Sequence, residues 1–153
     1  MARVISAGDG PTAMVRMGIA ALRETEPTRP TVLLGVGDVL AVVLVLAAGM
    51  LRHNVDPLQS PDHATMVIGP FLLGWIVGAP LVGAYSGGTL TSPRAVLATG
   101  TNAWFIAALV GLVLRATAWF PGGVTGLFGV VVTGFGLLAV GGWRILSGIL
   151  FAR

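Results

Sequence analysis

The stretch TVLLGVGDVLAVVLVLAAGML, residues 31–51, decides the fold class of this chain. It is apolar almost throughout, but it carries one carboxylate, Asp38, well inside the run. Three more apolar runs follow, at residues 65–84, 95–114 and 122–151. Each reaches the roughly 20 residues that an α-helix needs to cross about 30 Å of hydrocarbon. The sequence therefore predicts an all-α, polytopic membrane protein, a compact bundle of four transmembrane helices.

The composition is also typical of an integral membrane protein. Hydrophobic residues make up 55% of the chain and charged residues 10%, whereas ordinary soluble domains are roughly 25% charged. There is no cysteine, which excludes disulfides, thiolate nucleophiles and Cys-ligated metals. The net charge is +3, but the arginines are spread along the chain, so we expect no nucleic-acid partner.

The chain divides into a tail and a membrane domain. Residues 1–30 are predicted to be a cytoplasmic tail, in which residues 12–26 form either a weakly amphipathic surface helix or a disordered segment. No uninterrupted apolar stretch follows Arg3 before Arg16, so the tail does not resemble a cleavable signal peptide. Residues 31–153 are predicted to be the four-helix transmembrane domain.

The arginines also predict the orientation. Cytoplasmic loops carry more Lys and Arg than external ones, and placing both termini in the cytoplasm puts seven arginines inside and two outside. The seven are Arg3, Arg16, Arg23, Arg29, Arg94, Arg144 and Arg153, and the two are Arg52 and Arg115. We therefore expect a multi-pass protein of the plasma membrane. Trp119 and Phe120 would lie at its outer interface, with Tyr85 and Trp143 at the inner one.

Proline and glycine mark the expected helix boundaries. Ser60-Pro61 and Ser92-Pro93 each place a capping hydroxyl before a proline at the first helical position. Pro121-Gly122-Gly123 separates the third and fourth runs. Because the connections are short, neighbouring helices should run antiparallel.

Small residues recur at helical spacing in three of the four runs. Membrane helices associate largely through close packing at such residues. The seams serve either internal packing of the bundle or contact with another subunit or a flat lipid. Their members are Gly74, Gly78, Gly83, Ala103, Ala107, Gly111, Gly122, Gly126, Gly129 and Gly136.

Asp38 lies about 10 Å into the first span, at 1.5 Å per residue, where an unpaired charge is costly. Asn102 lies at the same expected depth in the third run, and Arg144 either stays at the surface or is drawn into the inner leaflet. We predict an intramembrane polar cluster of Asp38, Asn102 and Arg144 with Thr99 and Thr101. It would act as a proton or ion relay or a polar headgroup site, or else as a buried pair that fixes helix register. A simply protonated Asp38 is the remaining interpretation.

The outer loop contains His53, Asp56, Asp62 and His63. These side chains are weak candidates for a divalent metal, since their spacing matches no metal motif. We expect no metal and no cofactor, although a bound lipid or carotenoid is left open.

Several segments resemble a family of small prokaryotic four-span membrane proteins catalogued as domain of unknown function 3054. The resemblance covers about residues 31–150 and implies four spans, but no activity. It rests on PFLLGW at 70–75, APLVGAY at 79–85, LRAT at 114–117 followed by PGG at 121–123, GWR at 142–144 and Gly37-Asp38.

No catalytic constellation is found, so we do not expect an enzyme. The favoured function is that of a non-enzymatic assembly component, either a homo-oligomer or an accessory subunit of a membrane complex. The alternative is a small transporter or channel for protons, ions or solutes that uses the cluster around Asp38.

Overall fold

The computed structural model describes residues 28–151, and these residues form helices and turns with no strand. The long helices are α2 (Arg29–Arg52), α3 (Pro61–Leu81), α4 (Pro93–Arg115) and α5 (Gly126–Phe151). A short 3-10 helix, η1 (Thr89–Thr91), precedes α4. All four long helices are long and apolar enough to cross a membrane. The predicted all-α fold is confirmed, whereas residues 12–26, for which either a surface helix or a disordered segment is expected, lie outside the described residues.

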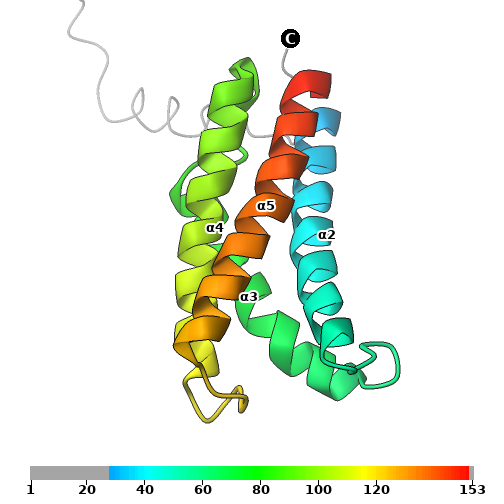
Figure 1. Cartoon of the computed structure of the whole chain (residues 1–153). Helices are drawn as coiled ribbons and strands as arrows, with labels where there is room; N and C mark the ends of the chain where they lie inside the picture. The colour runs from blue at the N-terminus through cyan, green and yellow to red at the C-terminus, as the bar shows by residue number, and fades with distance from the viewer. Residues whose placement is uncertain (1–27, 152–153) are drawn as a thin grey trace, which may run out of the picture.

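The helices pack in a ring in which α3 lies against α4, α4 against α5, and α5 against α2 (Figure 1). The start of α2 and the end of α5 lie at one end of the bundle, which we call the termini end (Figure 1). The α2–α3 and α4–α5 connections lie at the opposite end, which we call the loop end (Figure 1). In the figure α3 runs obliquely behind the other helices, and it contains two internal prolines, Pro70 and Pro80.

The two serine–proline boundaries behave differently. The Ser92 side chain accepts a hydrogen bond from the backbone N–H of Ala95 at 3.2 Å, as expected for an N-cap. Ser60 occupies the corresponding position before α3 but makes no side-chain cap bond. The cap predicted at Ser60 is therefore wrong, although the helix does begin at Pro61.

Glycines in the left-handed region move one boundary of each of two predicted spans. α3 ends at Leu81 rather than residue 84 because the chain turns at Gly83, whose φ is +63°. α5 begins at Gly126 rather than residue 122, after a turn containing Gly123 with φ +65°. The fourth helix is thus about 39 Å long at 1.5 Å per residue.

The small residues of α3 and α4 face each other. A Cβ added at Gly78 would lie 2.7 Å from the carbonyl oxygen of Ala103, and one at Gly74 would overlap the backbone of Ala107. Even a methyl group does not fit at either position. These two glycines therefore allow the backbones of α3 and α4 to approach closely. Most of the predicted seam between these helices is therefore used inside the bundle.

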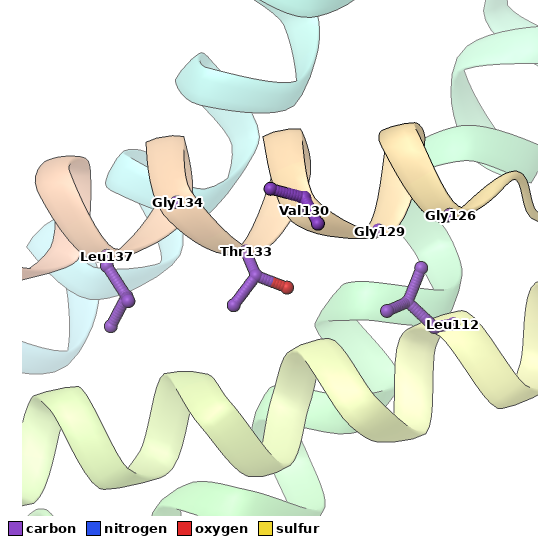
Figure 2. Close-up of a pocket in the computed structure, with 7 residues that line it drawn as sticks. All are labelled: Leu112, Gly126, Gly129, Val130, Thr133, Gly134 and Leu137. Carbon is purple, nitrogen blue, oxygen red and sulfur yellow. The ribbon is translucent and has the colours of Figure 1, made fainter.

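The remaining seam glycines have several environments. Gly111 makes room for the Phe71 ring and Gly136 for the Trp104 ring. Gly122 lies against the guanidinium of Arg115. The two others, Gly126 and Gly129, border a shallow apolar groove between α4 and α5, the α4–α5 groove, which is also lined by Leu112, Val130, Thr133, Gly134 and Leu137 (Figure 2).

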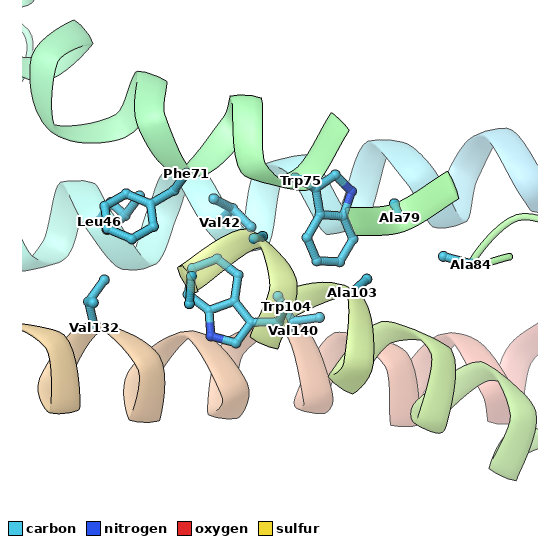
Figure 3. Close-up of a cluster of buried hydrophobic side chains, with 12 residues drawn as sticks. Val42, Leu46, Phe71, Trp75, Ala79, Ala84, Ala103, Trp104, Val132 and Val140 are labelled. Carbon is cyan, nitrogen blue, oxygen red and sulfur yellow. The ribbon is translucent and has the colours of Figure 1, made fainter. Parts of the chain in front are cut away.

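Aromatic rings fill the middle of the bundle (Figure 3). Phe71 and Trp104 stack with their ring centroids 6.1 Å apart, and both are fully buried. The indole N–H of Trp104 donates to the carbonyl of Thr133 at 2.9 Å, which satisfies its polar atom. Large apolar side chains elsewhere on all four helices point outward, as expected of surfaces that contact lipid.

The contact between α3 and α4 predicts the effect of one added methyl group. Gly74→Ala should lower the free energy of unfolding by about 1–3 kcal/mol, because the methyl overlaps the Ala107 backbone. Gly142→Ala is the matched control, since a Cβ there meets nothing within 4 Å. Thermal unfolding in a mild detergent measures both variants. Equal stability of the two would contradict the described packing.

Candidate functional site

The most polar contact in the interior joins the first and last spans. Arg144 of α5 binds Asp38 of α2 through two hydrogen bonds, Nε to Oδ1 at 2.8 Å and Nη2 to Oδ2 at 2.6 Å. Neither side chain has any exposed surface. This two-point geometry is the strongest arrangement of a guanidinium and a carboxylate. Among residues 28–151 no other ion pair is formed.

The third nitrogen of Arg144 reaches the other side of the bundle. Nη1 lies 3.3 Å from the carbonyl oxygens of Ala84 and Val96, and 3.4 Å from the Thr99 hydroxyl. Ala84 belongs to the connection after α3, while Val96 and Thr99 belong to α4. The guanidinium therefore uses all three nitrogens and links α5 to α2, to α4 and to the connection after α3.

Tyr85 completes the surroundings of the carboxylate. Its hydroxyl donates to Asp38 Oδ2 at 2.8 Å and accepts from the indole N–H of Trp75 at 2.9 Å. The Arg144 guanidinium also lies over the Tyr85 ring, 5.5 Å from its centroid. Burial raises the pKa of the Tyr85 phenol well above its usual range, so the phenol stays protonated and remains a donor.

Glycines provide the space for this cluster. A Cβ at Gly100 would lie 2.6 Å from the Arg144 side chain, and one at Gly37 would overlap the Trp143 ring. The Trp143 indole donates to the carbonyl of Leu34 at 3.1 Å, which adds a second contact between α5 and α2. We refer to Asp38, Arg144, Tyr85, Trp75 and Thr99 as the polar cluster.

The structure brings three of the five predicted residues together, since Asp38, Arg144 and Thr99 belong to the cluster. It does not bring in Asn102, which is exposed. The predicted depth could not determine the direction of this side chain. Neighbouring residues on a helix point about 100° apart. Because Ala103 faces the interior of the bundle, the preceding Asn102 points toward the surface. Thr101 is half-buried and makes no hydrogen bond to Asp38 or Arg144 among the described residues.

Sequence reasoning missed Tyr85 and Trp75 as members. The sequence predicts Tyr85 at the inner membrane interface, but its hydroxyl hydrogen-bonds to Asp38 inside the bundle. It is the single tyrosine of the chain, and a buried phenol requires a hydrogen-bond partner. The sequence places Tyr85 and the unpartnered Asp38 on the same side of the membrane domain. The need of both side chains for a hydrogen-bond partner was the signal that could have indicated their contact.

The four weak metal candidates lie at the loop end. Asp56 accepts hydrogen bonds from the Leu58 backbone and the Gln59 side chain within its own turn. Asp62 lies in the first turn of α3. His53 and His63 line a cavity described below. Within residues 28–151 no three His, Asp or Glu side chains are close enough to share a metal ion.

A family model described as "Protein of unknown function (DUF3054)" matches residues 35–147. The match covers well over half of the chain and includes every member of the polar cluster. The chain belongs to this family. No curated protein and no solved structure matches the chain. Membership of the DUF3054 family confirms the resemblance found in the sequence, and it brings no activity with it.

The geometry of the cluster predicts a structural role for the ion pair. Asp38→Asn should lower the free energy of unfolding by about 3–5 kcal/mol, because it leaves the Arg144 cation buried without a counter-charge. The double variant Asp38→Leu with Arg144→Met should recover most of this loss, since it removes both charges. Thermal unfolding in detergent measures both. An Asp38→Asn protein as stable as the wild type would contradict this structural role.

Proposed function

We propose that the protein is a non-catalytic integral membrane component that assembles with a second copy of itself through the outward face of α4. The observation that carries this proposal is the position of Asn102. Its side chain is exposed on an otherwise apolar stripe of the helix. The other members of this stripe are Ala98, Phe105, Leu109 and Val113.

A primary amide on this surface is unfavourable in a lipid environment. Asn102 lies about 14 Å along α4 from Pro93, close to the middle of the span, where the hydrocarbon offers no hydrogen-bond partner. Asn side chains between membrane helices do hydrogen-bond across the interface. In a two-fold dimer a residue that lies near the symmetry axis faces its own copy, so an axis passing close to Asn102 lets the two amides hydrogen-bond to each other.

The seams lend this proposal less support than the sequence suggested. Gly74, Gly78, Gly111 and Gly136 are used within one copy of the chain. The proposed dimer contact therefore depends on Asn102, on the outer surface of α4, and not on a stripe of glycines.

The transport alternative has weaker support. A pathway needs polar groups at successive depths with access to water. The Asp38 carboxylate and the Arg144 guanidinium are fully buried and hydrogen-bonded to each other. Neither the α4–α5 groove nor the cavity at the loop end is lined by either residue. A polar cluster that is closed to water supports a structural contact between α2 and α5 better than a proton or ion relay.

Asn102→Leu should shift the protein from dimer to monomer in a mild detergent, because it removes the hydrogen bond between copies. Gly142→Leu serves as the control, as it also adds an apolar side chain to an exposed helix position. Size-exclusion chromatography with light scattering measures the mass of each protein without its detergent. A wild-type monomer, or an Asn102→Leu protein with unchanged mass, would overturn the proposal.

The proposed orientation places both termini in the cytoplasm of a cell bounded by the plasma membrane. Because the chain lacks cysteine, single-cysteine variants report one position each. In spheroplasts, Leu58→Cys in the α2–α3 connection should react with an impermeant maleimide. Gly87→Cys in the α3–α4 connection should react only after lysis. Both positions are exposed, so the reverse pattern of labelling would invert the topology.

A further inference from the structure

The loop end contains a cavity of about 860 Å³ between α2, α3 and α5, which we call the loop-end cavity. Cavities of roughly 300–1,000 Å³ hold drug-sized ligands. Most of its wall is apolar, with Leu46 and Met50 from α2 and Val131 and Phe135 from α5. Its charged and ionisable lining consists of Arg52, His53, His63 and Arg115.

Arg115 is the unusual member of this lining. Its side chain is only 7% exposed, yet Asp38 and Arg144 form the single ion pair among the described residues, so Arg115 has no carboxylate partner there. Its Nη1 donates to the carbonyl of Met66 at 3.1 Å, and its Nε is buried without any acceptor. A buried cation that has no counter-charge and leaves its Nε unpaired is costly.

The side chains around Arg115 do not supply the negative charge that its guanidinium lacks. No Asp or Glu lines the cavity, whereas a second arginine and two histidines do. The nearby Asp56 already accepts two hydrogen bonds within its own turn. The lining therefore combines a cationic region with a large apolar wall.

We propose that the loop-end cavity binds an acidic amphiphile. Its carboxylate or phosphate would pair with the Arg115 guanidinium, and its hydrocarbon chain would lie against Val131 and Phe135 between α2 and α5. Arginine forms short, charge-assisted hydrogen bonds with both kinds of headgroup. The apolar wall can contact the hydrocarbon chain of an amphiphile, whereas a free inorganic anion would make no apolar contact with it. This binding does not depend on the proposed dimer, since it uses other helix faces.

A purely structural role explains less of the geometry. Arginine near a helix C-terminus interacts favourably with the helix dipole, and the Arg115 guanidinium lies 4.9 Å from the Phe128 ring centroid. However, the guanidinium hydrogen-bonds a carbonyl of α3 rather than one of its own helix. Neither contact provides an acceptor for the buried Nε.

The test uses the full chain, purified in a neutral detergent, and follows thermal unfolding by tryptophan fluorescence. Dodecyl phosphate and dodecanoate are the acidic probes. Dodecylphosphocholine has the same chain without net charge, and inorganic phosphate has the headgroup without a chain. At least one acidic probe should raise the unfolding temperature saturably, while the other two compounds should have no such effect at equal concentration.

Two variants assign the response to the cavity. Arg115→Gln should weaken the apparent affinity by about tenfold or more, since a charged hydrogen bond is lost. Gly49→Leu should abolish the response by filling the cavity. A Cβ at Gly49 meets nothing within 4 Å, so this variant tests the site even if Arg115→Gln fails to fold. Gly142→Leu, outside the cavity lining, should bind as the wild type does.

Three results would overturn the proposal. The first is no saturable response to either acidic probe. The second is an equal response to inorganic phosphate alone, which would indicate a free-anion site. The third is an unchanged response in both Arg115→Gln and Gly49→Leu, which would place binding elsewhere.

Discussion

The two hydrogen bonds between the Asp38 carboxylate and the Arg144 guanidinium hold together helices that are farthest apart in the chain. α2 contacts α5 more extensively than it contacts α3, so its place in the bundle depends largely on this contact. The same guanidinium reaches α4 and the connection after α3 through Nη1. Because each of these charges is costly when it is buried without its partner, arrangements of the helices that keep the pair intact are favoured over those that separate it.

The sequence predicted the coarse architecture well, because four long apolar runs permit little else. The boundaries were less certain: Gly83 and Gly123 adopt left-handed conformations that end one helix early and delay another. Within the polar cluster, the need of Asp38 for a partner was deducible. Asn102 was expected at the depth of Asp38, and Arg144 only if it was drawn into the inner leaflet. The choice between Arg144 and Asn102 was not deducible, since depth follows from residue counting whereas direction depends on which neighbours pack around the helix.

The two ends of the bundle differ in how their polar groups are satisfied. At the termini end, hydrogen bonds run from Trp75 to Tyr85 and from Tyr85 to Oδ2 of Asp38, while Arg144 Nε donates to Oδ1, so that neither carboxylate oxygen is unpaired. At the loop end, Arg115 lies beside a large cavity with an unsatisfied Nε. The hydrogen bonds of the Asp38 carboxylate are thus complete within one copy of the chain, whereas those of the Arg115 guanidinium are not.

The sequence distance between the two partners of the ion pair also affects biogenesis. Asp38 and Arg144 are 106 residues apart, so translation at roughly 5–20 residues per second leaves the carboxylate without its counter-charge for about 5–20 s. During that interval the first span must either carry a proton on Asp38 or remain near water at the insertion site. An ionised Asp38 is therefore costly in hydrocarbon until Arg144 has been made, whereas a protonated Asp38 avoids most of this cost.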